Sequence, residues 1–348
     1  MRSPFRPLAL TVATALLLAA CGGGSDPSAD PGTTAEPSVG GSLTVYSGRS
    51  ETLVGPVIER FEAATGVDVE VNYAGTTDLA ATILEEGDAS PADVFFAQDA
   101  GALGAVAAEG RLAELPQATL DRVDARFRAD DGRWVGVSGR ARVVVYDTRV
   151  LDAADLPTSI DAFTDPAWKD RIGWAPTNAS LHAFVTAYRT LKGDEAAKAW
   201  LEGIVANGAK VYEGNDAVLA AVAAGEVEVG FVNHYYLMRT LAEQGESYPV
   251  RNHFLDGADP GSLINVAGAG ILSTAKNPAA AQAFVDFLLS TETQEYFSTE
   301  THEYPLIAGV EADPALPPLA DVGSPDIDLS DLADLAGTLQ LMQEAGVL

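Results

Sequence analysis

Residues 134–146 read Trp-Val-Gly-Val-Ser-Gly-Arg-Ala-Arg-Val-Val-Val-Tyr, an extended and largely apolar run. The run is long for one strand, because strands of globular proteins most often have about five or six residues. Residues 263–272, Leu-Ile-Asn-Val-Ala-Gly-Ala-Gly-Ile-Leu, form a second apolar run that is rich in glycine. We interpret the first run as a strand that crosses from one lobe of the molecule to another, and the second as the return crossing.

Strand-like segments alternate with helical patterns on the N-terminal side of the first run. Residues 43–46 and 92–96 are apolar and rich in β-branched or aromatic side chains, which predicts buried strands. Between them, apolar side chains at helical spacing over residues 53–61 predict a helix, and Gly66 is a suitable residue to end it. This alternation predicts an α/β protein in which each lobe is a mainly parallel sheet flanked by helices.

Two crossings between two α/β lobes make a hinged clamp. In open α/β sheets, ligands bind beyond the carboxyl ends of the strands, so we expect the ligand in the cleft between the lobes. The loops to examine follow Tyr46, Phe96, Ile172 and Val232. The predicted lobes are discontinuous: residues 43–141 with 266–312 form the N-terminal lobe, and residues 142–265 with 313–348 form the C-terminal lobe.

The composition narrows the class of protein. The chain has 348 residues, enough for about two domains, and a formal net charge of -29 at pH 7. So acidic a surface repels nucleic acid and anionic lipid headgroups, and we expect neither as a partner. The sequence contains no Gly-x-Ser-x-Gly elbow, no Walker loop and no zincin motif. These observations favour a binding protein over an enzyme.

The N-terminal segment has the layout of a secretory signal. A basic start precedes an apolar run over residues 8–20, which is too short to span a bilayer comfortably. The run ends in Leu-Ala-Ala-Cys at Cys21, the only cysteine, and resembles the lipobox of bacterial lipoproteins; the alternative is a plain signal peptide with a chance cysteine. Gly, Ser, Pro and Thr dominate residues 22–41, which indicates a flexible tether. We therefore predict a signal peptide over residues 1–20 and a lipid-anchored tether over residues 21–42, with the body outside the cytoplasm on the cell membrane.

The most unusual polar cluster is Asn233-His234-Tyr235-Tyr236, which follows a predicted strand over residues 227–232. Aromatic side chains pack well at strand ends, so packing alone explains a pair of tyrosines there. A functional interpretation requires that other residues of the cleft agree with it.

Other sequence segments of the predicted cleft support a functional interpretation of the tyrosine pair. Several lie in the predicted strand-end loops and crossings, in the same order as in a known family. These blocks are 46–51, 96–101, 139–142, 174–178, 215–216, 259–263 and 303–306. They resemble the periplasmic ferric-ion-binding protein family, the bacterial transferrins, and the resemblance covers residues 43 to about 310. It implies a two-lobed periplasmic-binding-protein clamp of the class II type.

The resemblance also implies a set of iron ligands. In the family, the adjacent tyrosines bind Fe³⁺ as phenolates, which carries over to Tyr235 and Tyr236. Some relatives add a histidine and a glutamate, and these positions correspond here to Ser50 and Gln98. The chain thus lacks one nitrogen ligand and one carboxylate ligand. Asp99 or Glu51 is a possible replacement, although both are equally well explained as solvated loop charges.

An anion, phosphate or carbonate, completes the iron coordination in this family. Its contacts correspond here to Asp99, Arg140, Arg142, Asn178, Ala179, Ser180 and Asn215. A guanidinium together with backbone N–H groups is a reasonable cradle for an anion. The alternative for the two arginines is that they anchor the lobes through ion pairs.

The resemblance implies a role in import. A monomeric receptor would capture ferric ion with its synergistic anion outside the cell and deliver it to the permease of an ABC transporter, driven by a cytoplasmic ATPase. The alternative function on the same fold is a receptor for a small organic or phosphonate ligand, because a fold does not determine its ligand.

Overall fold

The computed structural model describes residues 40–348. The predicted signal peptide, Cys21 and all but the last residues of the predicted tether lie outside the described part. Within residues 40–348, no helix is both long enough and apolar enough to cross a membrane.

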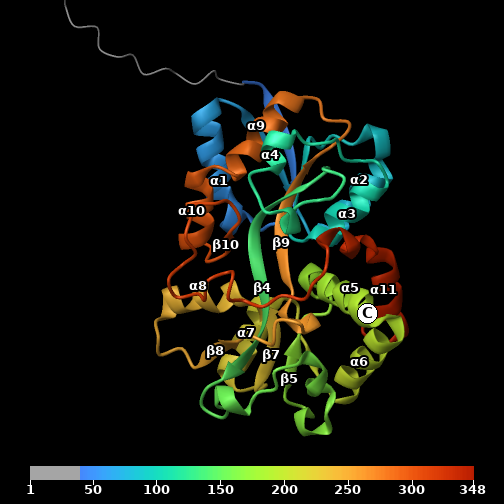
Figure 1. Cartoon of the computed structure of the whole chain (residues 1–348), viewed down its shortest axis with the longest axis vertical. Coiled ribbons are helices and arrows are strands. Elements are labelled where there is room, and N and C mark those ends of the chain that lie inside the picture. The colour runs from blue at the N-terminus through green and yellow to red at the C-terminus, as the bar shows by residue number, and fades with distance from the viewer. Residues whose placement is uncertain (1–39) are drawn as a thin grey trace, which may run out of the picture. The chain divides into compact units, whose positions relative to one another are not determined.

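Strand β4 (Val135–Asp147) is the central element, and all its residues are buried. Its first part pairs antiparallel with β9 (Ile264–Ile271), and its second part pairs antiparallel with β7 (Val229–Asn233). The change of partner falls between Ala141 and Arg142. Figure 1 shows β4 and β9 side by side in the middle of the body. The strand therefore links two sheets, as the length of the run predicts.

The first lobe is built on the strands β2-β1-β3-β9 and the first part of β4. Strands β1 to β3 are parallel to one another, whereas β9 and β4 run antiparallel to their neighbours, so the sheet is mixed. The strands of this lobe not yet given are β1 (Ser42–Ser47), β2 (Asp68–Tyr73), β3 (Val94–Ala97) and β10 (Tyr304–Pro305). Its helices are α1 (Glu51–Thr65), α2 (Thr76–Glu86), α3 (Ala100–Ala108), α4 (Gln117–Leu120), α9 (Pro278–Leu288) and α10 (Thr291–Thr299).

The second lobe continues from the far part of β4 through β7, β5 and β6. Aromatic side chains fill its core, where Trp200 contacts Trp174 and Phe231. The remaining strands are β5 (Ile172–Trp174), β6 (Lys210–Val211) and β8 (Val250–His253). Its helices are α5 (Ala179–Lys192), α6 (Asp194–Ala206), α7 (Asn215–Ala224) and α8 (His234–Gln244).

The last part of the chain contacts both lobes. The short 3₁₀ helix over Leu329–Ala333 packs against α3, whereas α11 (Leu335–Glu344) packs against α5 and α6. The assignment of residues 313–348 to one lobe, like the other lobe boundaries, stays a prediction.

Local sequence explains why these elements form where they do. Gly66 ends α1 in the left-handed region at a φ of 71°, as predicted. Asn178 begins α5 by accepting a hydrogen bond from the backbone N–H of Ser180. A Cβ added to Gly268 of β9 would lie 2.8 Å from the carbonyl oxygen of Val135, which explains the glycine-rich sequence of the return strand.

Candidate functional site

A cavity of about 160 Å³ lies between the lobes, at the carboxyl ends of β1, β3 and β7. The first lobe contributes the loop before α1 and the residue after β3, and the second lobe contributes the starts of α7 and α8. The side chains that line it include Arg49, Ser50, Gln98, Asp216, Tyr235, Tyr236 and Arg239. All four residues predicted as metal ligands, Ser50, Gln98, Tyr235 and Tyr236, therefore face one cavity.

The two tyrosines lie in the first turn of α8, directly after β7. Tyr235 is 1% exposed and Tyr236 is 8% exposed, and their rings stack with centroids 4.3 Å apart. Burial, together with the neighbouring Tyr236, raises the pKa of the Tyr235 phenol well above 10. The phenol is therefore neutral at neutral pH until a cation replaces its proton.

A buried ion pair supports Tyr235 from the first lobe. The Arg49 Nη2 atom lies 2.5 Å from Glu303 Oε1, and both side chains are almost fully buried. The Arg49 guanidinium carbon lies 5.9 Å from the centroid of the Tyr235 ring. Glu303 also accepts a hydrogen bond from the Ser138 hydroxyl. The sequence alone did not indicate this pair, because its members are 254 residues apart.

Arg140 is the most unusual cation of the described region. Its side chain is fully buried, and none of its three guanidinium nitrogens has a hydrogen-bond partner among the described residues. Its one ion-pair contact among the described residues is long: Arg140 Nε lies 4.0 Å from Glu303 Oε1. Burial and the neighbouring Arg49 lower the pKa of Arg140. A buried guanidinium without hydrogen-bond partners is the kind of group that an anion would stabilise.

Arg142 belongs to a second polar group with Ser180 and Asn215. Its Nη1 atom and the Asn215 side-chain amide donate to the Ser180 hydroxyl at 3.4 and 3.3 Å. Burial lowers the pKa of Arg142 to about 9. The Ser180 hydroxyl donates in turn to the Asn178 side chain at 2.6 Å, and Ala179 is the first residue of α5. The structure thus brings most of the predicted anion contacts together.

Asp99 has a structural function at the start of α3. One carboxylate oxygen accepts from the backbone N–H of Ala102, and the other has no hydrogen-bond partner among the described residues. Burial raises the pKa of Asp99 to about 6. Neither Asp99 nor Glu51 lines the cavity of the two tyrosines. The carboxylate that does line it, Asp216, was not among the predicted ligands, although it directly follows the predicted Asn215.

His234 uses both ring nitrogens within the hinge. Nδ1 accepts a hydrogen bond from the Ala141 backbone N–H, and Nε2 donates to the His302 carbonyl oxygen. Burial lowers the pKa of His234 to about 4, so the ring is neutral. Among the described residues, no group of three or more His, Cys, Asp and Glu side chains suits a metal ion.

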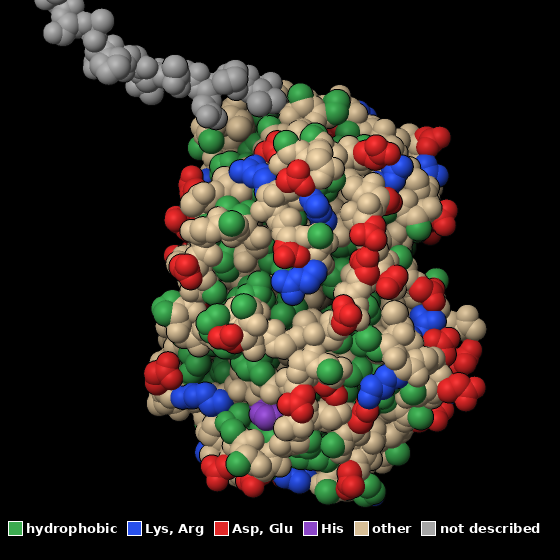
Figure 2. Space-filling view, viewed as in Figure 1, with side chains coloured by type: hydrophobic (Ala, Val, Ile, Leu, Met, Phe, Trp, Pro, Cys, Tyr) green, Lys and Arg blue, Asp and Glu red, His purple; other side chains and the backbone are tan. Residues whose placement is uncertain are grey.

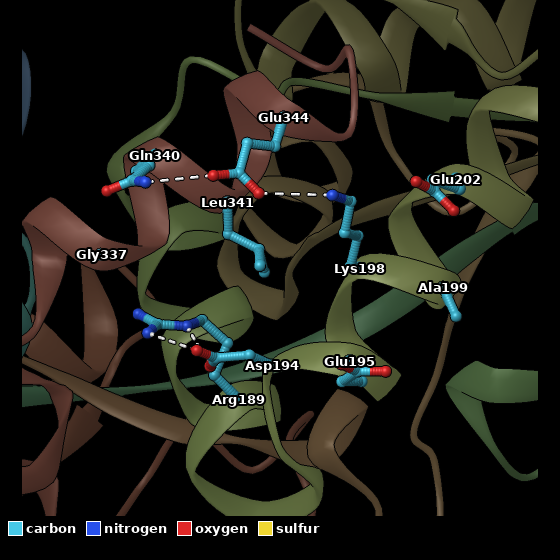
Figure 3. A pocket seen from close by; sticks show the side chains of 10 residues that line it. All are labelled: Arg189, Asp194, Glu195, Lys198, Ala199, Glu202, Gly337, Gln340, Leu341 and Glu344. Carbon is cyan, nitrogen blue, oxygen red and sulfur yellow. Dashed lines mark hydrogen bonds and ion pairs between the residues drawn. The ribbon is translucent and has the colours of Figure 1, made fainter.

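A larger cavity, of about 660 Å³, lies elsewhere, between α6 and α11. Figure 3 shows that charged side chains of this cavity pair with one another. Lys198 lies 3.3 Å from Glu344, and Arg189 lies 2.8 Å from Asp194. These pairs satisfy the cations of the cavity, and nothing there resembles the polar site between the lobes.

Two α/β lobes joined by a crossing strand, with a polar cavity at the strand ends, define a two-lobed periplasmic binding protein. A family model for bacterial extracellular solute-binding proteins matches residues 57–321. The chain is 36% identical to the major ferric iron-binding protein of Neisseria meningitidis serogroup A, over 90% of this chain and 96% of that protein. It is 34% identical to the Fe(3+)-binding periplasmic protein of Serratia marcescens, over 88% of this chain and 90% of that protein. The chain therefore belongs to the family of bacterial extracellular solute-binding proteins.

Solved structures agree with this assignment. Iron-bound HitA from Pseudomonas aeruginosa is 36% identical with a TM-score of 0.84, covering 88% of this chain and 99% of that one. IdiA (FutA) from Trichodesmium, in complex with iron and citrate, is 29% identical with a TM-score of 0.75, covering 88% of this chain and 100% of that one. These findings confirm the resemblance found in the sequence blocks, the two-lobed fold, and the prediction of a binding protein rather than an enzyme.

Proposed function

We propose that this protein captures ferric ion outside the cell and is the solute-binding component of an ABC importer. The observation that carries the proposal is the stacked pair Tyr235 and Tyr236 at the wall of a cavity between the lobes. Fe³⁺ is a small, hard ion, and phenolate is a strong anionic oxygen donor. The iron-bound and ferric-binding relatives support the same ligand.

Ferric ion itself favours the deprotonation of the phenols that bind it. A trivalent charge beside a phenol favours the phenolate strongly, so binding releases protons and its affinity rises with pH. Ser50 and Gln98 face the same cavity from the other lobe, so an ion bound to the tyrosines contacts both lobes. Such an ion stabilises the closed arrangement over the open one. We propose that this closed, loaded form is delivered to a permease and its ATPase.

A synergistic anion completes the proposal. Arg140 offers unpaired guanidinium nitrogens, and the group around Ser180 offers hydroxyl and amide donors together with the start of α5. Phosphate or carbonate would satisfy these donors. The second anion type to test is a hydroxycarboxylate, since the Trichodesmium relative was solved with iron and citrate.

The tyrosines can be tested directly. Tyr235→Phe and Tyr236→Phe each remove one hydroxyl, so the fold should persist while ferric affinity falls by at least about 100-fold. The visible absorbance band from phenolate to Fe³⁺, followed during titration with ferric nitrilotriacetate, measures both variants. Tyr188→Phe is the matched control, because Tyr188 is also buried but donates its hydroxyl to Asp161. If both cavity variants titrate like the parent, the pair is only packing and the small organic ligand becomes the better function.

We also propose attachment to the cell membrane through a lipid on Cys21. This residue lies outside the described residues, and the support is the lipobox-like sequence before it and the tether-like composition after it. Replacing the thiol in Cys21→Ser removes the acceptor for the lipid, so the body should be released from the membrane. Fractionation of cells that express each form measures the release. A Cys21→Ser protein that stays in the membrane fraction would show that the anchor is elsewhere.

A further inference from the structure

The cavity of the two tyrosines holds one carboxylate among the described residues that line it. That carboxylate belongs to Asp216, the second residue of α7. The other charged side chains of the cavity wall are the cations Arg49 and Arg239. Ser50 and Gln98, from the first lobe, are neutral. The anionic oxygen that this wall can offer a metal ion, apart from the two phenols, therefore comes from Asp216.

Apart from a hydrogen bond to its own backbone, the Asp216 carboxylate has no partner among the described residues that would occupy it. It forms no ion pair and no hydrogen bond with another side chain of the described region; Arg239 acts on it only as a nearby charge. An acidic residue in the first turn of a helix stabilises the helix dipole, which explains an acid at the start of α7. It does not explain why this acid lines the same cavity as the two phenols. The side chain is exposed as well as lining the cavity, so an incoming ion can reach it.

A site loaded with Fe³⁺ and two phenolates still carries positive charge, which a carboxylate of the protein would offset alongside the synergistic anion. Fe³⁺ with two phenolates has a net charge of +1, and Arg239 adds positive charge at the same wall, whereas the charge of Arg49 is neutralised by Glu303. Hard trivalent ions prefer anionic oxygen, and a carboxylate is the only such protein group left at the cavity among the described residues. We propose that Asp216 is a third protein ligand of the ferric ion. This inference rests on the proposed function and adds a ligand to it.

The proposal assigns all the anionic protein ligands to one lobe. Asp216, Tyr235 and Tyr236 come from α7 and α8, which pack against each other in the second lobe. Ferric ion therefore binds this lobe first, and the neutral side chains of the first lobe close over it. Loss of Asp216 weakens the initial capture of the ion rather than the closure.

Three variants of the full chain test the ligand. Asp216→Asn keeps the size of the side chain but removes its charge, so ferric affinity should fall by about 10- to 100-fold. Losing an anionic donor makes the iron more electron-poor, so the phenolate-to-iron absorbance band should move to longer wavelength. Asp216→Glu, which retains the carboxylate, should recover most of the affinity and the band position of the parent.

Asp78→Asn is the matched control. Asp78 also lies in the first turn of a helix, α2, and lines the neighbouring cavity that shares Gln98 with the tyrosine cavity. It does not line the tyrosine cavity itself. The control should keep the parental band and affinity, and the melting temperature of each metal-free variant should match that of the parent.

The outcomes separate this inference from the proposed function. A parent protein that develops no visible band with ferric nitrilotriacetate contradicts both. A parent that develops the band while Asp216→Asn keeps its position and affinity contradicts the Asp216 ligand alone. An equal loss of affinity in Asp78→Asn and Asp216→Asn, with no band shift in either, also overturns it, because a general charge effect would then explain the data.

Discussion

Arg49 combines two interactions in a buried position. It neutralises Glu303 in a place where neither side chain reaches solvent, and it lies against the ring of Tyr235 across the cleft. A buried carboxylate without its partner is costly, because a low-dielectric interior does not solvate the charge. The ion pair therefore matters for the fold of the first lobe as well as for the position of Tyr235.

We expect Arg49→Met to destabilise the metal-free protein by about 3–5 kcal/mol, because it removes the 2.5 Å partner of the buried Glu303 and leaves only Arg140, at 4.0 Å, as a cation beside it. Chemical denaturation measures the loss. Arg60→Met is the matched control: Arg60 also lies over a tyrosine ring, at 5.0 Å from Tyr296, but its ion pair with Glu292 is exposed. The control should lose about 1 kcal/mol or less. Equal losses in the two variants would show that the buried Arg49–Glu303 pair contributes no more to stability than the exposed Arg60–Glu292 pair.

The residue scale also shows where sequence reasoning ends. The tyrosine pair, Ser50 and Gln98 were predicted to share a site because the family resemblance assigns them ligand positions, and they all lie in loops that follow predicted strands. Arg49 and Glu303 could not be paired, because no local pattern relates residues so distant in the chain. Asp216 had a local signal, its place in the block with Asn215, but the direction of its side chain depends on how α7 packs against α8.

At the scale of elements, β4 is the feature that the sequence predicts most directly. A run of apolar residues too long for one sheet has to continue into another, and the structure has the change of partner at Ala141 and Arg142. The mixed character of the sheets was not predicted, since composition does not distinguish a parallel from an antiparallel neighbour. The tail that contacts both lobes was also missed, because its contacts depend on distant surfaces of α3, α5 and α6.

His234 connects this hinge to the start of α8. Its neutral ring bridges the Ala141 N–H and the His302 carbonyl, and burial holds its pKa at about 4, below the ordinary value of 6.5. The unfolded chain therefore takes up a proton at a higher pH than the folded chain. Stability is fully present above about pH 6.5 and is lost as the pH falls toward 4.

We expect the metal-free protein to lose up to about 3 kcal/mol of stability between pH 6.5 and 4 through His234, at about 1.4 kcal/mol per pKa unit. His234→Gln keeps a donor and an acceptor but does not titrate, so this variant should lack that part of the pH dependence. Denaturant unfolding of both proteins at several pH values gives the difference. Parallel curves for the parent and the variant would contradict a buried neutral histidine at the hinge.

At the scale of the whole molecule, the excess of acidic residues is the dominant electrostatic feature. The chain has 50 Asp and Glu residues against 21 Lys and Arg residues. Figure 2 shows acidic side chains spread over the visible face of the body rather than gathered in one patch. Such a distribution keeps a protein soluble but destabilises the folded state through mutual repulsion. Exposed ion pairs such as Arg126–Asp124 oppose this effect only weakly.

Salt screens both the repulsion and the ion pairs. Screening the repulsion raises the stability, whereas screening the ion pairs lowers it, so the direction of the salt effect shows which contribution is larger. Repulsion among many like charges acts over distances that exceed the Debye length of about 10 Å at 0.1 M salt, whereas exposed ion pairs contribute about 0–1 kcal/mol each. We therefore expect sodium chloride to raise the melting temperature of the metal-free protein at pH 7, measured by differential scanning calorimetry from low to high salt. Near pH 4.2, the isoelectric point calculated from the sequence, the net charge vanishes and the increase should disappear. A melting temperature that falls with salt at pH 7 would show that the ion pairs outweigh the repulsion.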